Sequence, residues 1–422
     1  MKKNGSKRTK NQATNAPEQR PLRLAAIIRR NLYAFVIDEG MKALDELLER
    51  DRDLVCGPAH HKRGSHEAQR WGYTQGRLAM GGQRVTVRKP RARRDGQEVA
   101  LPSWEQFADQ DPLDERTLQQ MLVGVSTRDY GRSVEPIPEK HNPHGASRSA
   151  ASRRFVAKTK EKLEDWTTRD IGDLGIVAVM LDGIEVGEHT VIVALGIDES
   201  AGKHPLGMWL GATENAVVCG KLIDELIRRG LDAQRSYLFV IDGGKALRKA
   251  IVDRFKHRAL VQRCQVHKMR NVRSHLPKKL HASVCKQVSD AYNGKSKKVA
   301  KDRLTKLARF LEDEHPDAVK SLREGLEETL TLKDMGLPTV LERTLSTTNA
   351  IENLNSTIRR ITGRVKRWRD GKMVKRWMAG AVLEAQRGFR RLRGCNGMHL
   401  LVAALRRHAE QIDRVDREEQ AA

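Results

Sequence analysis

Residues 175–197 read GIVAVMLDGIEVGEHTVIVALGI and carry the clearest structural signal in the chain. Two short and almost continuous apolar runs, Gly175–Leu181 and Thr190–Ile197, flank a more polar segment. Runs of this length and composition are typical of strands that are buried on both faces of a sheet. We therefore expect two strands that lie close together in the sequence, the first of which ends at Asp182.

A further apolar run, YLFVI, occupies Tyr237–Ile241, and HPLGMWLG at residues 204–211 is a candidate for another strand. Between these two segments, apolar residues at helical spacing indicate a helix that ends near Gly230: Leu222, Leu226 and Ile227. Strands that alternate with a helix in this order predict a mixed α/β sheet.

Two aspartates follow buried strands directly and are themselves followed by glycine: Asp182 and Asp242. A buried carboxylate is costly unless it is solvated, paired or bound to a cation. Ligands in open α/β sheets collect at strand ends, and Mg²⁺ would remove the repulsion between two such carboxylates. Two ions could then activate an attacking oxygen and stabilise a leaving one. The alternative interpretation is that each Asp-Gly pair only marks a turn at the end of a strand.

A third carboxylate, Glu352, lies in the helical segment TLSTTNAIENLNSTIRR. Three- and four-residue spacing places it on one polar helix face with Thr348, Ser356 and Arg359. It is a candidate third metal ligand. Alternatively, Asn349 and Glu352 form a capping box, which needs the glutamate only for backbone hydrogen bonds.

Cys264 and His267 form a C-x-x-H pair, and His281 and Cys285 could complete a set of four zinc ligands. A single Cys–His pair is weak support for zinc, so a pair without metal beside the sheet is the favoured interpretation.

The charge balance predicts a polyanionic partner, because 79 Lys and Arg against 54 Asp and Glu give a formal net charge of +25. Aromatic residues make up only 4%, which argues against a single-strand binder with rows of stacking rings and favours double-stranded DNA. The five cysteines are scattered and odd in number, as expected in a reducing cytoplasm. We also find no apolar run long enough for a membrane span and no signal peptide.

The N-terminal third reads as a series of DNA-binding elements. Residues 1–22 are expected to be a disordered basic tail, with a solvated terminus of no function as the alternative. Residues 23–110 combine helices with a small β element at Val85–Val87, followed by an arginine-rich loop at Arg88–Arg94. This loop could follow a phosphate backbone or be a plain solvated loop.

Residues 111–172 resemble a helix-turn-helix with a basic final helix, a pattern that many helical bundles share. Leucines at helical spacing make residues 276–340 an all-helical segment, and the chain after Thr344 is helical and strongly basic. The candidate DNA-contacting residues are Arg88, Arg91, Arg93, Arg94, Arg153, Arg154, Arg359, Arg360 and Arg367.

Five segments in this order resemble the bacterial insertion-sequence transposases of the Mutator type. They are VAVMLDGIEV, ALGIDESAGKHPLGMWLGATEN, LFVIDGGKALRKAI, VQRCQVHKMRNV and TTNAIENLNSTIRRITG, and the match runs from STRDYGRSVE to GFRRLRG. The last two are the most specific.

The resemblance implies a ribonuclease-H-like catalytic domain formed by residues 173–275 and 341–395, with residues 276–340 as a helical insertion and 396–422 as a C-terminal helix or tail. It implies a DDE triad of Asp182, Asp242 and Glu352 that binds two Mg²⁺ ions, with Mn²⁺ as a substitute. Cys264 and His267 match the C-x-x-H signature of the family.

The implied partners are the terminal inverted repeats and the target DNA, handled in the bacterial cytoplasm by a homodimer or higher oligomer. Two other functions remain open. One is a two-metal nuclease of the same fold, which would cut DNA without joining strands. The other is a DNA-binding regulator without enzymatic activity.

Overall fold

The computed structural model describes residues 19–59, 68–80, 82–109, 112–211, 213 and 215–421. The chain forms two compact units, one of residues 1–121 with 125–155 and one of residues 122–124 with 156–422. Residues 1–18 of the predicted basic tail lie outside the described part of the chain, and the first helix begins at Gln19.

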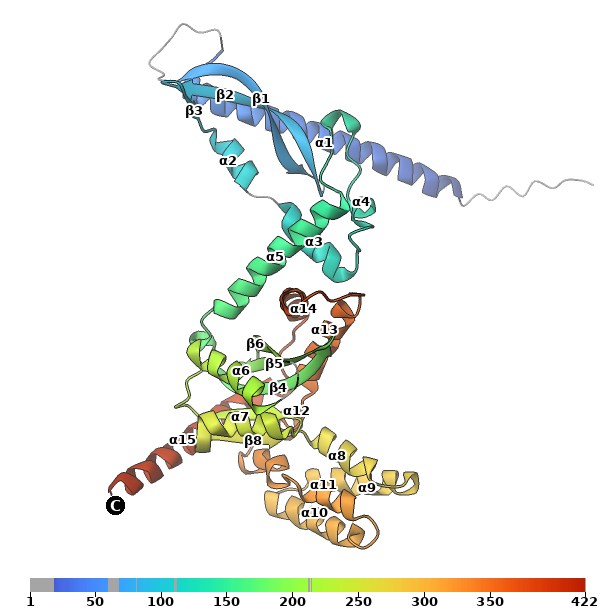
Figure 1. Cartoon of the computed structure of the whole chain (residues 1–422), viewed down its shortest axis with the longest axis vertical. Helices are drawn as coiled ribbons and strands as arrows, with labels where there is room; N and C mark the ends of the chain where they lie inside the picture. Colours follow the sequence, from blue (N-terminus) through green and yellow to red (C-terminus); the bar gives the residue numbers. More distant parts are fainter. Residues whose placement is uncertain are drawn as a thin grey trace, which may run out of the picture. The chain divides into compact units, whose positions relative to one another are not determined.

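The N-terminal part contains a long helix, a small antiparallel sheet with strand order β1-β2-β3, and several further helices (Figure 1). Its elements are α1 (Gln19–Cys56), β1 (Gln69–Met80), β2 (Gln83–Arg94), β3 (Gln97–Val99), α2 (Pro102–Asp109), α3 (Pro112–Val123), α4 (Tyr130–Ser133), a 3₁₀ turn (Glu139–His141) and α5 (Arg148–Thr168).

A hydrophobic cluster joins α1 to the small sheet. Its members from α1 and from the first two strands are Ile37, Met41, Leu44, Leu48, Leu78, Val85 and Val87. Trp104 of α2 packs against this cluster so closely to β1 that a side chain at Gly76 would collide with the indole ring. The glycine therefore allows α2 to approach the strand.

The predicted β element at Val85–Val87 is confirmed, but the predicted arginine-rich loop after it is wrong. Arg88–Arg94 continues strand β2, which pairs with β1 along most of its length. Small or ring-closed side chains at alternate positions, Pro90 and Ala92, are buried, while the arginines between them are more exposed. The strand therefore continues through the arginine-rich segment, because buried and exposed side chains keep alternating there.

The expected helices of residues 111–172 are present as α3, α4 and α5. Helix α4 begins at Tyr130 with Asp129 as its N-cap. The Ser126 hydroxyl donates to the Asp129 carboxylate at 2.7 Å, which closes the turn before the helix.

The C-terminal unit is organised around a five-stranded sheet with the order β6-β5-β4-β7-β8 (Figure 1). Its strands are β4 (Ile176–Val186), β5 (His189–Asp198), β6 (Lys203–Gly211), β7 (Tyr237–Ile241) and β8 (Ala259–Arg263). Neighbouring strands β4, β5 and β6 are antiparallel, whereas β7 is parallel to both β4 and β8. The predicted mixed α/β sheet is confirmed, and so is the strand at residues 204–211.

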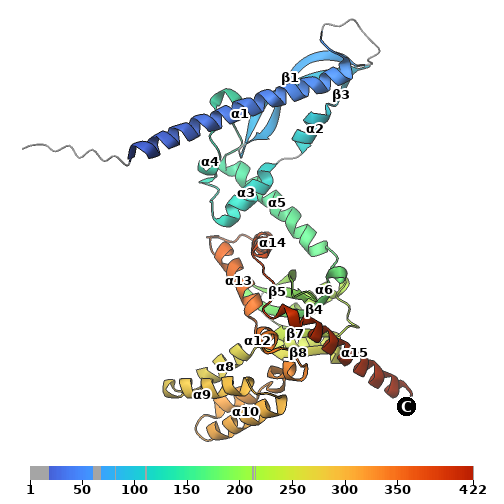
Figure 2. The same cartoon turned by 180° about the vertical axis from the view of Figure 1, so that it is seen from behind.

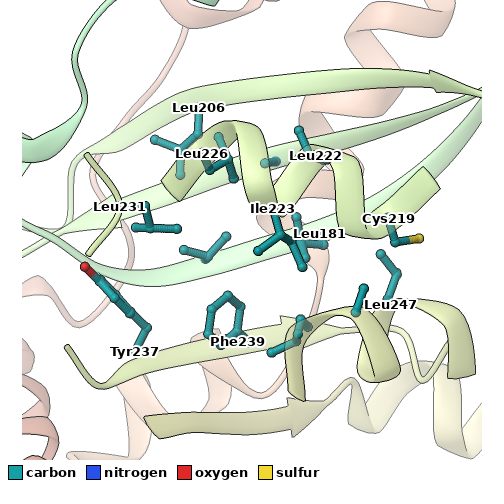
Figure 3. Packing of buried hydrophobic residues seen from close by; sticks show 14 of the residues in the cluster. Leu181, Leu206, Cys219, Leu222, Ile223, Leu226, Leu231, Tyr237, Phe239 and Leu247 are labelled. Carbon is teal, nitrogen blue, oxygen red and sulfur yellow. The ribbon is translucent and has the colours of Figure 1, made fainter. Parts of the chain in front are cut away.

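One face of this sheet is covered by α6 (Ala216–Arg228) and α7 (Lys245–Phe255). Figure 3 shows the core between them, in which Leu222, Ile223 and Leu226 of α6 face Leu181 and Phe239 of the strands. Burial of each such side chain contributes about 1.5–3 kcal/mol. Because side chains alternate along a strand, the residue after Leu181 points to the opposite face of the sheet.

A helical segment follows β8 and has a core of its own. It consists of α8 (Gln265–Ser274), α9 (Lys278–Tyr292), α10 (Lys297–Leu311), α11 (Pro316–Arg323) and 3₁₀ turns at Glu327–Thr329 and Thr331–Asp334. Helices α8–α11 pack on one another (Figure 2), with Leu304, Leu307 and Leu322 in their core. The all-helical prediction for residues 276–340 is confirmed.

The chain then returns to the sheet through α12 (Thr339–Leu345), α13 (Asn349–Thr362) and α14 (Gly371–Arg387), and ends in a 3₁₀ turn (Cys395–Gly397) and α15 (Met398–Ala421). Throughout the described residues, no helix combines the length and the apolar character needed to cross a bilayer.

Candidate active site

Asp182 lies inside β4, where it pairs with Val193 of β5, so the expectation that it ends the strand is wrong. Its neighbour β7 does end there, because Leu181 pairs with Ile241, the last residue of β7. Leu181 and Ile241 are thus paired on two parallel strands, and Asp182 and Asp242 are the residues that directly follow them. The backbone brings the two predicted aspartates side by side.

Both oxygens of the Asp182 carboxylate are held. The Gly183 backbone N–H donates to Oδ1 at 3.0 Å, and the Asn355 side-chain amide donates to Oδ2 at 2.7 Å. Burial raises the pKa of Asp182, and the negative charge of Asp242 raises it further, while the bond from Asn355 opposes both effects. Two acidic groups in a poorly solvated place repel each other.

Asp242 lies in the turn between β7 and α7. Its Oδ1 accepts a hydrogen bond from the Gly244 backbone N–H at 2.9 Å. Gly243 between them has a φ of 111°, a backbone conformation that favours glycine. The glycines after Asp242 thus shape a tight turn that holds the carboxylate beside the N-terminus of α7.

Glu352 occupies the first turn of α13, and no capping box forms. The N-cap of α13 is Thr348 without a side-chain capping bond, and Asn349 already belongs to the helix. The Thr348 hydroxyl donates to Glu352 Oε1 at 2.6 Å, a bond between side chains. The Glu352 carboxylate is therefore oriented by the Thr348 side chain and does not cap the backbone of the helix.

Cys264 and His267 lie against this end of α13. Cys264 is the N-cap of α8, directly after β8, and its side chain is fully buried. The Thr348 hydroxyl is 3.3 Å from both Cys264 Sγ and His267 Nδ1, and His267 Nδ1 is 3.7 Å from Glu352 Oε1. One threonine hydroxyl thus contacts three functional side chains.

The cluster of Cys264, His267 and Glu352 interacts electrostatically with Asp242. The pKa of His267 is raised by its hydrogen bond with Cys264, against the effect of burial, and also by the negative charges of Glu352 and Asp242. Burial alone would raise the pKa of Cys264, but hydrogen bonds from His267 and Thr348 outweigh it and lower the pKa. The acidic side chains around His267 therefore stabilise the protonated form of its imidazole.

Within the described ranges, one group of three candidate metal ligands has all its ligand atoms within 4.8 Å of one another: Cys264, His267 and Glu352. The carboxylates of Asp182, Asp242 and Glu352 do not converge that closely. His281 and Cys285, the candidate partners in a zinc set, lie on α9 and do not join the group. His281 instead contacts the carbonyl oxygen of Leu276 at 2.9 Å.

Asn355 is the site residue that the sequence did not single out. The predicted polar face of the helix contained Ser356, which is exposed in the structure, whereas Asn355 is fully buried. Asn355 follows Thr348 by seven residues and Glu352 by three, so all three lie along one stripe of the helix. That spacing was the only signal available in the sequence.

The comparisons with known proteins agree on one family. The model of the Mutator family of transposases matches residues 27–391. The chain belongs to the Mutator family of transposases. All five sequence segments quoted for the resemblance lie inside this match, which includes residues of both compact units.

Relatives of this transposase-family chain come from several bacteria. The transposase for insertion sequence element IS256 in transposon Tn4001 of Staphylococcus aureus is 25% identical over 331 residues, which cover 75% of this chain and 81% of that protein. The transposase for ISRM5 of Rhizobium meliloti is 28% identical over 331 residues (76% and 79%), and that for IS406 of Burkholderia multivorans 29% identical over 258 residues (58% and 63%).

The donor set of this family member fits hard divalent cations. Asp182 and Asp242 supply carboxylate oxygens, the ligands that Mg²⁺ and Mn²⁺ prefer. Burial raises the pKa of Asp182 and the charge of Asp242 raises it further, and a cation would oppose both effects. The Cys264 sulfur suits such ions poorly, and its burial and hydrogen bonds favour a supporting role.

The predicted DNA-contacting arginines are spread over several elements. Arg88 and Arg94 of β2 are exposed, but Arg91 is half-buried and paired with Glu98 at 3.0 Å, and Arg93 is half-buried beside the Trp71 ring. On other elements, Arg153, Arg359, Arg360 and Arg367 are exposed, while Arg154 is half-buried and donates to the Gly145 carbonyl at 3.0 Å. Arg88 also stacks on the Tyr73 ring, with its guanidinium carbon 3.5 Å from the ring centroid, so exposure alone does not separate these arginines from the contacts of the fold.

Proposed function

We propose that this chain is a DNA transposase that binds the terminal inverted repeats of its insertion sequence and catalyses metal-dependent strand cleavage and strand transfer. The observation that carries the proposal is the alignment of Asp182 and Asp242 on paired strands, with Asp182 hydrogen-bonded to the helix that carries Glu352. Family membership alone would not assign these residues, and their positions on neighbouring strands and on the helix bonded to Asp182 support the assignment.

The proposal includes a ribonuclease-H-like catalytic domain. Its support is the strand order β6-β5-β4-β7-β8, in which three antiparallel strands are followed by two parallel ones. In such a sheet the first and fourth strands of the domain are neighbours, so their ends can present two carboxylates to one phosphate.

Asp182, Asp242 and Glu352 would hold two Mg²⁺ ions, with Mn²⁺ able to substitute. Bound there, the ions would activate the attacking oxygen and stabilise the charge on the leaving oxygen of an in-line displacement at phosphorus. The protein's own part is to hold the carboxylates in place, through Gly183 and Asn355 at Asp182 and through Thr348 at Glu352.

Two displacements at phosphorus make up the proposed reaction. In the first, water attacks the phosphodiester at the end of the element and releases a 3′-OH. In the second, that 3′-OH attacks a phosphodiester of the target DNA and displaces a target 3′ oxygen, so one bond forms for each bond broken. The handling of two element ends calls for a homodimer or a higher oligomer on DNA, working at the nucleoid in the bacterial cytoplasm.

The test is cleavage and strand transfer of labelled duplexes that carry the terminal repeats found beside the gene. We expect Asp182→Asn, Asp242→Asn and Glu352→Gln each to lose more than about 100-fold in cleavage, since loss of a direct ligand should exceed the cost of losing a supporting residue. Binding to the repeats should persist in all three, because phosphate contacts come from other side chains. Full cleavage by any of the three variants would remove that residue from the site.

The same assay separates the two remaining alternatives. A nuclease of the same fold would release cut ends but never join a 3′-OH to target DNA. A DNA-binding regulator would bind the repeats without cutting them. The presence of all three carboxylates favours the transposase over the regulator, because a protein that only binds DNA does not need them.

A further inference from the structure

Asn355 is a polar residue buried among apolar side chains of α13. Its neighbours on the inward side of the helix are Ile351, Leu354 and Ile358, and all of them are fully buried, as Asn355 itself is. Its amide nitrogen donates to Asp182 Oδ2 at 2.7 Å. Its own Oδ1 is buried and has no hydrogen-bond partner in the structure.

Packing alone does not explain an asparagine at this place. A leucine would suit the contact between α13 and the sheet, whereas a buried amide loses water on both polar atoms and here recovers only one hydrogen bond. The unpaired oxygen makes the residue costly for folding. What the asparagine provides in return is a fixed contact with one carboxylate.

The contact also defines how Asp182 is presented. With Gly183 on Oδ1 and Asn355 on Oδ2, both oxygens are fixed, so the plane of the carboxylate cannot rotate freely. Each carboxylate oxygen has two lone pairs, and each of these bonds uses one. One lone pair on each oxygen is left for a cation.

We propose that Asn355 is a positioning residue, which orients Asp182 for the metal ion and ties α13, and with it Glu352, to β4. The proposal rests on the proposed function, because it assigns Asn355 to the same metal-dependent site. Glu352 lies one turn before Asn355, so the Asn355–Asp182 bond fixes the separation between two of the three carboxylates.

The experiment compares Asn355→Leu with the wild-type full-length chain and uses Asn353→Leu, at an exposed position of the same helix, as the matched control. Three quantities are measured: the thermal midpoint without metal, the affinity for Mn²⁺ by titration calorimetry without DNA, and Mg²⁺-dependent cleavage of the repeat duplex. Asn355→Ala is measured in parallel, so that a fold defect of the leucine variant cannot hide the answer.

We expect Asn355→Leu to unfold near the wild-type midpoint, since removal of the unpaired amide oxygen offsets the loss of the bond to Asp182. Its Mn²⁺ affinity and its cleavage rate should both fall about 10- to 100-fold, as for other residues that support metal ligands. A raised Mn²⁺ concentration should recover part of the cleavage. Asn353→Leu should match the wild type in all three measurements.

Wild-type Mn²⁺ affinity and cleavage in both Asn355 variants would overturn the positioning role and leave the proposed function intact. If instead the wild type bound no Mn²⁺ and cut no DNA, the proposed function itself would fall, and the role of Asn355 with it.

Discussion

The hydroxyl of Thr348 has one proton and three polar atoms in reach, Glu352 Oε1, His267 Nδ1 and Cys264 Sγ. The hydroxyl donates its proton in the shortest contact, to Glu352 Oε1 at 2.6 Å, because a hydrogen bond to a carboxylate is stronger than one to a neutral acceptor. The hydroxyl oxygen can then accept from His267 Nδ1 at 3.3 Å, in agreement with the raised pKa of His267. Thr348 thus links the Cys264–His267 pair to Glu352.

Replacement of Thr348 tests this link. Thr348→Val keeps the shape of the side chain but removes the hydroxyl, so we expect cleavage to fall about 10- to 100-fold. Thr348→Ser keeps the hydroxyl and should retain most of the activity. The cleavage rates and thermal midpoints of both variants are compared, and equal rates for valine and threonine would show that the hydroxyl does not orient Glu352.

The residues of the candidate site differ in how far the sequence could predict them. Asp182 and Asp242 follow apolar runs, so their position directly after buried strand residues was readable from local pattern, although β4 continues past Asp182. Glu352 was equally consistent with a capping box, and only the family resemblance favoured it. Asn355 could not be found, because its partner Asp182 lies 173 positions earlier and helical spacing does not distinguish it from Ser356.

Among the strands of the five-stranded sheet, β4, β5 and β7 were predictable from their apolar runs, whereas β8 was not. The run Ala259–Arg263 contains only three apolar residues, and its character as β8 depends on parallel pairing with β7. Likewise, Asp182-Gly183 reads locally as a turn, yet β4 continues through it because β5 supplies hydrogen bonds as far as Val186. Tertiary pairing decided both cases.

Helix α9 contains a group whose ionisation should affect stability at high pH. Burial raises the pKa of Tyr292 to about 12, above its usual value near 10. The folded chain keeps the phenol neutral, so its contribution to stability is complete below about pH 10 and is lost as the pH rises towards 12.

Tyr292→Phe should remove that part of the alkaline loss of stability. Urea unfolding at pH 9 and pH 11.5 gives the free energy of unfolding of both proteins. We expect the wild type to lose about 2 kcal/mol more than the phenylalanine variant between these two pH values. Equal losses would mean that Tyr292 ionises as easily in the folded chain as in the unfolded one.

At the scale of the whole chain, the net charge of +25 and the exposed arginines on several elements favour binding to a polyanion such as duplex DNA. Each phosphate that a cation neutralises releases counterions, so the affinity for duplex DNA should fall linearly with salt on a double-logarithmic plot. Distributed charge of this kind strengthens binding to any duplex and does not by itself select the terminal repeats.

Removal of single arginines should change that plot in a predictable way. Arg359→Ala and Arg360→Ala should each reduce the steepness of the salt dependence by about 0.9 if the side chain contacts a phosphate. Arg323→Ala is the control, since this arginine is already paired with Glu312 at 2.6 Å. An unchanged slope in the first two variants would remove α13 from the DNA-contacting surface.

The central claim is that Glu352 acts with Asp182 and Asp242 as a metal ligand in DNA cleavage, and Glu352→Cys tests it most directly. A thiolate is a poor ligand for Mg²⁺ but is better accepted by the softer Mn²⁺. Cleavage of the terminal-repeat duplex is measured with the wild type and the variant in each metal. The variant should be inactive with Mg²⁺ and recover activity with Mn²⁺, whereas wild-type cleavage by the variant with Mg²⁺ would contradict the claim.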